Sequence, residues 1–209
     1  MSDLVILSLA SFPDVKTMAL IAQNEAVKIE VNDTYLKQTF RNRYRITSTT
    51  GATDLSIPVH SSQGNRAYSS VKIDYKNHWN RTHWRTLTAA YNNSPYFEYY
   101  CDAYEELLKS QVESLLEFNL KALQILCTDL GLKMPAVTSI WENPNEIIGA
   151  DFRDWILPNT EENFLHEPYT QVFSDRFGFI SGCSILDLLF CLGPDAKFYL
   201  HNFQVPRNR

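Results

Sequence analysis

Residues 4–31, LVILSLASFPDVKTMALIAQNEAVKIEV, decide the fold class. The apolar run Leu4–Leu9 and the alternating run Val27–Val31 both predict strands. Between them, Pro13–Asn24 places apolar side chains at helical spacing and predicts a helix. A strand, a helix and a strand within about thirty residues form a βαβ unit, whose two strands are normally parallel neighbours. The sequence therefore predicts an α/β fold.

Further elements follow along the chain. The runs Tyr44–Ser48 and Asp54–Val59 flank Thr50-Gly51, a pattern that is typical of a β-hairpin. Shorter patterns predict strands at Val71–Tyr75, Ala136–Ile140 and Tyr169–Phe173, and helices at Trp79–Tyr91, from Ser94-Pro95 onward, and at Ser184–Leu192.

A long packed helix is expected over Ser110–Leu130. Ser110 and Glu113 have the spacing of a capping box, and Gly131 follows the end of the apolar stripe. A chain of 209 residues can bury one substantial core. We therefore expect one domain over residues 1–209, in which a single mixed sheet contains the βαβ start and the hairpin and the long helix packs against it.

Residues 36–46, LKQTFRNRYRI, hold the densest group of basic and amide side chains and begin just past the second strand. As a strand, this segment would point Arg41, Arg43 and Arg45 to one face. Arginine can donate two parallel hydrogen bonds to a phosphate or carboxylate, so this face would suit an anion. Ligands of α/β sheets bind beyond the carboxyl ends of strands, which is where this segment begins. As a short helix, the segment would place Arg41 and Arg45 on a face without Arg43. A solvated basic edge strand is the plainer interpretation.

Composition excludes several classes of function. A net charge of -5 argues against a nucleic-acid partner. The four cysteines form no CxxC pair and no zinc spacing, which indicates buried thiols in a reducing cytoplasm rather than a metal site. The chain has no apolar run as long as a membrane span, and no P-loop, GxGxxG, GxSxG or HExxH motif. We expect a cytoplasmic protein without a membrane span, and no particular cofactor is indicated.

Two residues are candidates for acid–base chemistry. His83 lies beside the apolar stripe of its helix, where it is either a general base or a hydrogen-bonded packing residue. Asp187 follows Ser184 at capping-box spacing, so it is either a helix-start residue or a buried catalytic carboxylate.

The order of short motifs along the chain resembles the WbqC-like protein family. The resemblance rests on KQTFRNR (37–43), LSIPV (55–59), VKID (71–74), HWR (83–85), SPYFEYY (94–100), QVF (171–173), SILDLLF (184–190) and the closing Gly193-Pro194. It implies a role in bacterial surface-polysaccharide (O-antigen) synthesis. Transfer of an amino-acid or acyl group onto a nucleotide-linked sugar is the activity that the resemblance suggests.

These observations support two hypotheses. In the first, the protein is a transferase in which arginines hold an anionic group of a nucleotide-sugar and His83 removes a proton. In the second, it is a non-catalytic protein that binds an anionic ligand or partner at the same arginines. The candidate catalytic residues are His83 and Asp187, and the candidate ligand-binding residues are Lys37, Gln38, Arg41, Asn42, Arg43, Tyr91 and Tyr96.

Overall fold

A parallel sheet with the βαβ start organises the fold. The computed structural model describes residues 4–60, 67–139, 149–157 and 167–205. The first strand is β1 (Leu4–Ser8), and helix α1 (Val15–Gln23) leads from it to β2 (Val27–Glu30). The two strands pair in parallel with Val5 opposite Val27 and Ser8 opposite Glu30, so the predicted βαβ unit and the α/β class are confirmed.

Two short strands complete this sheet, which has the order β5-β2-β1-β6. Strand β5 (Ala136–Thr138) pairs in parallel with β2, and β6 (Gly149–Asp151) pairs in parallel with β1. All the carboxyl ends therefore meet at one edge. The predicted strand at residues 136–140 is confirmed over 136–138, and residue 140 lies outside the described residues.

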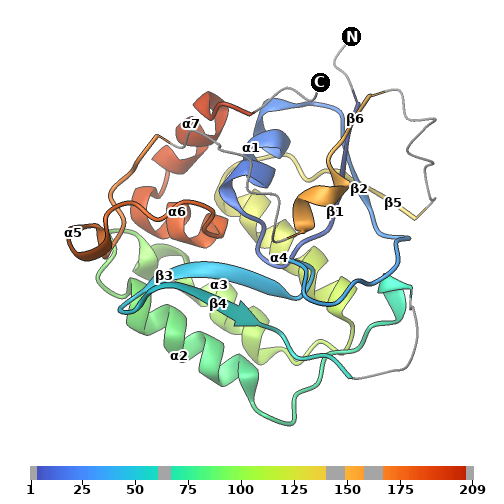
Figure 1. The fold of residues 1–209 in the computed structure, drawn as a ribbon, viewed down its shortest axis with the longest axis horizontal. Coiled ribbons are helices and arrows are strands. Elements are labelled where there is room, and N and C mark those ends of the chain that lie inside the picture. Colours follow the sequence, from blue (N-terminus) through green and yellow to red (C-terminus); the bar gives the residue numbers. More distant parts are fainter. Residues whose placement is uncertain (1–3, 61–66, 140–148, 158–166, 206–209) are drawn as a thin grey trace.

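The hairpin forms a second sheet. Strands β3 (Arg43–Ser48) and β4 (Gly51–Ser56) pair antiparallel, as expected. The expectation of a single mixed sheet is wrong because β5 and β6 already pair with the outer sides of β2 and β1. The hairpin lies apart from the parallel sheet, beside α2 and α6 (Figure 1).

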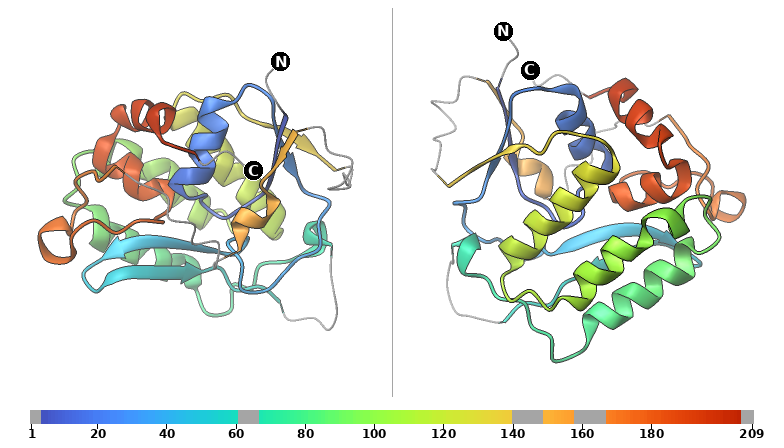
Figure 2. Two further views of the ribbon diagram at one scale, coloured as in Figure 1. Left: turned by 45° about the horizontal axis from the view of Figure 1, so that its top comes forward. Right: turned by 180° about the vertical axis from the view of Figure 1, so that it is seen from behind.

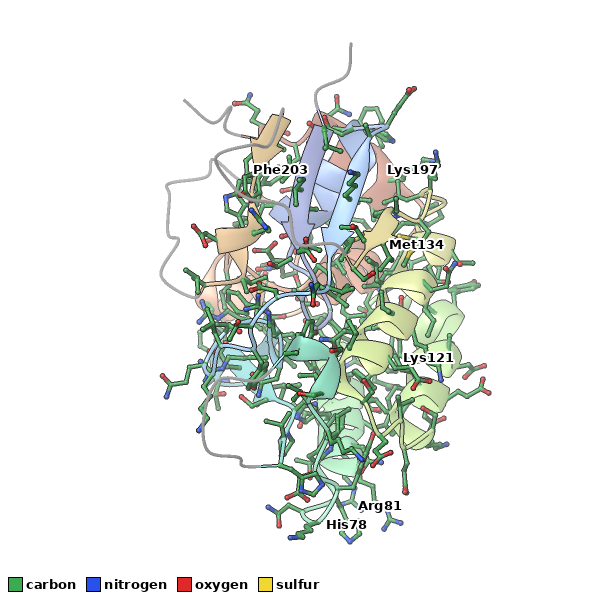
Figure 3. All side chains as sticks on the ribbon, turned by 90° about the vertical axis from the view of Figure 1, so that its right-hand side faces the viewer. His78, Arg81, Lys121, Met134, Lys197 and Phe203 are labelled. Carbon is green, nitrogen blue, oxygen red and sulfur yellow. The ribbon has the colours of Figure 1, made fainter. Side chains whose placement is uncertain are left out.

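Three consecutive helices follow the hairpin: α2 (Trp79–Tyr91), α3 (Phe97–Lys109) and α4 (Leu115–Asp129). Figure 2 shows them side by side, with α4 nearest the parallel sheet. His78 and Arg81, at the start of α2, lie at one end of the molecule, and Lys197 lies at the other (Figure 3). Helix α2 matches its prediction, and α4 packs into the core through Leu115, Phe118 and Leu123.

The boundaries of the next two helices differ from the prediction. Helix α3 ends at Lys109, and Gln111 adopts a left-handed conformation with φ of 48°, which interrupts the expected helix 110–130. Ser114, not Ser110, caps α4 by accepting a hydrogen bond from the Glu117 N–H at 3.3 Å. At the start of α3, Ser94 does not act as the N-cap, because its hydroxyl donates back to the Tyr91 carbonyl at 2.7 Å.

Two predicted strands are absent from the described residues. Residues 71–75 form only isolated bridges, Val59 to Ile73 and Lys72 to Ser114. Residues 169–173 lead into the short helix α5 (Ser174–Phe177). The Gln171 side chain makes hydrogen bonds with the N–H and the carbonyl of Ile180, in place of the backbone pairing of a strand.

Helices α6 (Ile185–Leu192) and α7 (Asp195–Asn202) close the fold beside α1. The N-cap of α6 is Ser184, as expected, since its hydroxyl accepts from the Leu186 N–H at 3.3 Å. Within the described part of the chain, no helix has the length and apolar character needed to cross a bilayer.

Candidate anion-binding site at the carboxyl edge of the parallel sheet

Polar side chains end three neighbouring strands at the carboxyl edge. Ser8 ends β1, Glu30 ends β2 and Asp151 ends β6. The chain leaves β1 toward β2 on one side, whereas β6 lies on its other side. Ligands of open α/β sheets bind beyond the carboxyl ends where strand order changes direction in this way.

The segment from Thr39 to Asn42 crosses this edge and is fixed by its backbone. The Phe40 carbonyl accepts from the Ser11 N–H, and the Phe40 N–H donates to the Ile156 carbonyl, both at 2.8 Å. The carbonyl of Arg41 accepts from the Asn119 side-chain amide at 2.7 Å and from the Ser11 hydroxyl at 2.9 Å. The Arg41 backbone is therefore held between the β1–α1 loop and α4.

The side chain of Arg41 is enclosed, being 1% exposed. Its Nη2 contacts Asp33 Oδ2 and lies 3.5 Å from the Ser8 hydroxyl, and its guanidinium carbon lies 5.6 Å from the centre of the Tyr68 ring. Burial lowers the pKa of Arg41, and the Asp33 carboxylate opposes that shift. Its Nε and Nη1 are buried and have no hydrogen-bond partner among the described residues.

A second unpartnered polar atom lies at the same edge. Glu30 is 0% exposed, and its Oε1 accepts from the Asn32 N–H at 2.7 Å, while Oε2 has no partner among the described residues. Glu30 stands opposite Ser8, whose hydroxyl contacts Arg41. Buried polar groups are nearly always hydrogen bonded, so unpartnered donors and an unpartnered acceptor at one edge need an explanation.

Two further cations are buried at this edge, each beside a carboxylate. Arg153 donates to Asp151 from Nε at 3.0 Å and from Nη2 at 2.8 Å, which makes a local Arg–carboxylate pair. Hydrogen bonding to Asp151 raises the pKa of Arg153, and the charges of Glu30 and Asp33 act in the same direction. Lys16 lies 3.8 Å from Asp14 and 5.0 Å from the Trp155 ring.

The three arginines of the predicted basic stretch lie in two environments. Arg43 and Arg45 share a face of β3, where Asp54 lies 3.9 and 2.8 Å away. Arg41 precedes that strand and turns into the protein, so the three arginines do not form one face. The alternative as a short helix is wrong, because residues 43–48 form a strand.

The other candidate residues of this stretch do not contact the Arg41 side chain in the hydrogen bonds that hold it. Asn42 donates to the Ile57 carbonyl at 2.9 Å and thereby joins its segment to the end of the hairpin. Lys37 and Gln38 are exposed, and Gln38 has a φ of 62°.

His83 lies in the core between α2 and the hairpin. It is 4% exposed, its Nδ1 lies 3.0 Å from the Tyr44 hydroxyl, and its ring meets Trp79 edge-on at 4.8 Å. Burial lowers the pKa of His83 to about 4, although a hydrogen bond with the Ser56 backbone opposes the shift. The neighbours of His83 are thus core residues, whereas Arg41 contacts Ser8, Asp33 and Tyr68.

Asp187 and Tyr91 lie together in an enclosed polar cluster. Oδ1 of Asp187 accepts from the hydroxyls of Thr47 and Tyr91, both at 2.7 Å. Oδ2 accepts from the Tyr169 hydroxyl at 2.6 Å and from the Gln171 amide at 2.8 Å. The carboxylate is 0% exposed and joins β3, α2 and the segment before α5 to α6. Four donors on one enclosed carboxylate indicate a structural anchor.

Tyr96 is half-buried and packs against the turn between α6 and α7. A Cβ on Gly193 would come within 2.5 Å of its ring, which explains glycine at that turn. The structure thus brings Tyr91 and Asp187 together, but places both of them and His83 away from the contacts of Arg41.

Sequence reasoning missed Ser8, Glu30, Asp33 and Tyr68 as site residues. A signal existed for two of them, since Ser8 and Glu30 are polar residues that end apolar or alternating strand runs. Across the described ranges, no cluster of three or more His, Cys, Asp or Glu side chains is arranged to hold a metal ion. A groove of about 970 Å³ lies at the opposite, amino edge of the sheet. Met134 and Lys197, which are labelled in Figure 3, are among its lining residues.

Comparison with known proteins agrees with the resemblance seen in the sequence. The model of the WbqC-like protein family matches residues 11–147, a range that includes Asp33 and Arg41 and ends before Asp187. "Uncharacterized protein Rv1507c" of Mycobacterium tuberculosis (strain H37Rv) is 25% identical over 194 residues, which cover 79% of this chain and 83% of that protein. No solved structure matches the chain.

Proposed function

The chain belongs to the WbqC-like protein family, and we propose that it binds an anionic small molecule of bacterial surface-polysaccharide (O-antigen) synthesis at Arg41. The ligand we expect is a phosphate-bearing or carboxylate-bearing molecule such as a nucleotide-linked sugar. The association of the family with polysaccharide synthesis supports this choice of ligand, and the position of Arg41 at the carboxyl edge of the sheet supports this choice of site.

One observation carries this proposal. The guanidinium of Arg41 is enclosed, yet its Nε and Nη1 have no hydrogen-bond partner among the described residues. Each buried donor left without an acceptor costs about 1–3 kcal/mol. A phosphate or carboxylate oxygen accepts such donors in charge-assisted hydrogen bonds, which are roughly twice as strong as neutral ones.

Binding is the function that the geometry of the described residues supports best. His83 and Asp187 are left out of this proposal, because their hydrogen bonds go to Tyr44 and to the Thr47, Tyr91, Tyr169 and Gln171 side chains, and not to Arg41. Lys37 and Gln38, which are exposed on the segment before Arg41, are proposed to meet the outer part of the ligand.

The binding proposal is tested by melting temperature. Inorganic pyrophosphate and a panel of nucleotide-linked sugars should stabilise the wild type by mass action, by about 2.7 kcal/mol at a hundredfold excess over Kd. Arg41→Lys keeps the charge but loses the two-nitrogen geometry, so it should lose most of this gain. Arg43→Gln is the control, since Arg43 lies at the partly exposed Asp54 pair. Equal ligand-induced shifts in wild type and Arg41→Lys would remove Arg41 from the site.

Group transfer is the second candidate, and Glu30 is the observation that favours it. Its unpartnered Oε2 is an acceptor at the same edge as Arg41, where it would take a proton from a sugar hydroxyl or an amine. In that case Glu30→Gln should abolish turnover of a nucleotide-linked sugar while pyrophosphate still raises the melting temperature. Unchanged turnover in Glu30→Gln would exclude Glu30 as the base.

A further inference from the structure

Asp33 contacts Nη2 of Arg41, the nitrogen that an oxyanion would also need for a two-nitrogen hydrogen-bonded contact. A guanidinium offers two edges for two-nitrogen hydrogen bonding, Nε with Nη2 and Nη1 with Nη2. Asp33 Oδ2 contacts Nη2, the nitrogen common to both edges, while Nε and Nη1 stay without partners among the described residues. Nη2 carries two N–H groups, one on each edge, and the Ser8 hydroxyl lies 3.5 Å from Nη2 beside Asp33 Oδ2. Asp33 and Ser8 together therefore engage Nη2 on both edges, and departure of Asp33 frees one of them.

Asp33 is also the member of the pair that reaches solvent. The Asp33 side chain is 19% exposed, against 1% for Arg41. Its Oδ1 accepts from the exposed Thr34 N–H at 2.6 Å, and the Ser8 hydroxyl donates to Oδ2 at 3.4 Å. Asp33 is thus the partner of Arg41 that contacts both solvent and the enclosed guanidinium.

Rotation of the Asp33 side chain alone would clear Nη2. The Asp33 carbonyl accepts from the Tyr68 N–H at 2.8 Å, and Thr34 bridges to Ala67, so the backbone is held. Arg41 is held independently, through its carbonyl bonds to Ser11 and Asn119 and by the Tyr68 ring beside its guanidinium. Arg41 would therefore keep its position after Asp33 leaves.

We propose that Asp33 is a built-in competitor at the anion site and determines which anions enter. Its carboxylate rotates off Nη2 when a ligand oxyanion presents two acceptor oxygens, and the ligand then takes a complete two-nitrogen edge. The need to displace Asp33 favours phosphates and carboxylates over chloride. A phosphate or carboxylate makes two hydrogen bonds to Arg41 in place of the Asp33 contact, whereas a chloride ion is a single acceptor atom and cannot bind both nitrogens of an edge in the same way. The inference rests on the proposed anion-binding function and names the residue that sets its specificity.

The test compares Kd for inorganic pyrophosphate in the wild type, Asp33→Asn and Asp54→Asn, measured by titration calorimetry. Asp33→Asn removes the competing charge at nearly constant size, so pyrophosphate should bind about tenfold tighter or better. Asp54→Asn is the matched control, because Asp54 is also a partly exposed carboxylate paired with arginines, and its Kd should equal that of the wild type. Chloride at the same ionic strength should bind none of the three proteins measurably.

The outcomes separate the two claims. Pyrophosphate binding in Asp33→Asn that is equal to or weaker than in the wild type overturns the competitor role and leaves anion binding intact. No binding in the wild type or in Asp33→Asn overturns both claims. If Asp33→Asn is too unstable for calorimetry, its melting temperature is followed against pyrophosphate, and a shift no larger than that of the wild type overturns the competitor role.

Discussion

At the scale of single residues, burial decides what each charge in this protein does. Arg41 and Arg43 are two positions apart, yet Arg41 is enclosed on Asp33 and Arg43 is partly exposed beside Asp54. Removing one partner of a buried pair leaves an uncompensated charge, whereas exposed pairs contribute little. Arg41→Gln should therefore lower stability markedly and Arg43→Gln hardly at all, which chemical denaturation would measure.

His83 predicts a pH dependence of stability. Its pKa is about 4 in the folded protein and about 6.5 when unfolded, so the unfolded state binds more protons between these values. The stability contribution is therefore complete above pH 6.5 and is lost as pH falls toward 4, by roughly 3 kcal/mol in total. His83→Gln should remove this part of the slope of unfolding free energy against pH. The exposed His201→Gln is the control, and an unchanged slope in His83→Gln would contradict the assignment.

Asp187 predicts a stability effect of a different kind. Asp187→Asn keeps the size of the side chain but replaces one carboxylate oxygen with an amide NH₂ group. Each carboxylate oxygen accepts two hydrogen bonds, so the new NH₂ donor would face two other donors. We expect the free energy of unfolding to fall by about 1–3 kcal/mol, the cost of a buried donor left unpaired. Asp195→Asn, on the exposed face of α7, should change it little. A wild-type unfolding curve for Asp187→Asn, with loss of a ligand response instead, would restore Asp187 as a functional residue.

At the scale of elements, two competing capping boxes decide where α4 begins. Ser110 and Glu113 have the same spacing as Ser114 and Glu117, and the structure uses the second pair. Ser114→Ala should cost about 1 kcal/mol, as is usual for loss of an N-cap. Ser110→Ala removes only a hydrogen bond to the Leu107 carbonyl at the end of α3 and should cost less. Urea unfolding of the two variants measures the difference, and a larger loss in Ser110→Ala would contradict the assigned boundary.

The same elements show what the sequence can and cannot predict. The βαβ unit and the hairpin follow from local apolar patterns, because each strand or helix shows its own period. The break between α3 and α4 depends on a left-handed Gln111, a conformation that tertiary packing imposes and composition does not favour. The separation of the hairpin from the parallel sheet could not be predicted, because pairing between distant strands such as β1 and β6 has no local signal.

The candidate site shows the same limit. The polar ends of β1 and β2 could be predicted to meet at one edge, because parallel strands align their carboxyl ends. The Asp33 contact with Arg41 could not be predicted, since the two residues stand eight positions apart in irregular chain and no spacing rule connects them. The sequence left His83 as either a general base or a hydrogen-bonded packing residue, and it could not indicate that Tyr44 and Trp79 would contact its ring.

At the scale of the whole molecule, the polar groups beside the two sheets differ in how completely they are hydrogen bonded. The hairpin, α2 and α6 enclose His83 and Asp187 in hydrogen-bonded clusters that tie distant segments together. The parallel sheet instead gathers Ser8, Glu30 and Arg41 at its carboxyl edge, with donors and an acceptor left unpartnered among the described residues.

We expect salt to weaken anion binding at the carboxyl edge of the parallel sheet, because the contact is between charges. Calorimetry at low and moderate ionic strength measures it, and an affinity independent of salt would contradict an ionic site.

The most direct test of the central claim is the NMR signal of the Arg41 Nε–H group. This group is buried and has no partner among the described residues, so a bound oxyanion should change its chemical shift strongly. On titration with inorganic pyrophosphate, we expect a saturable shift of the Arg41 signal, with smaller changes at Arg43 and Arg45. The Arg41 signal is assigned through its loss in Arg41→Lys. An Arg41 signal that stays in place while pyrophosphate saturates the protein, or that moves no more than those of Arg43 and Arg45, would contradict this expectation.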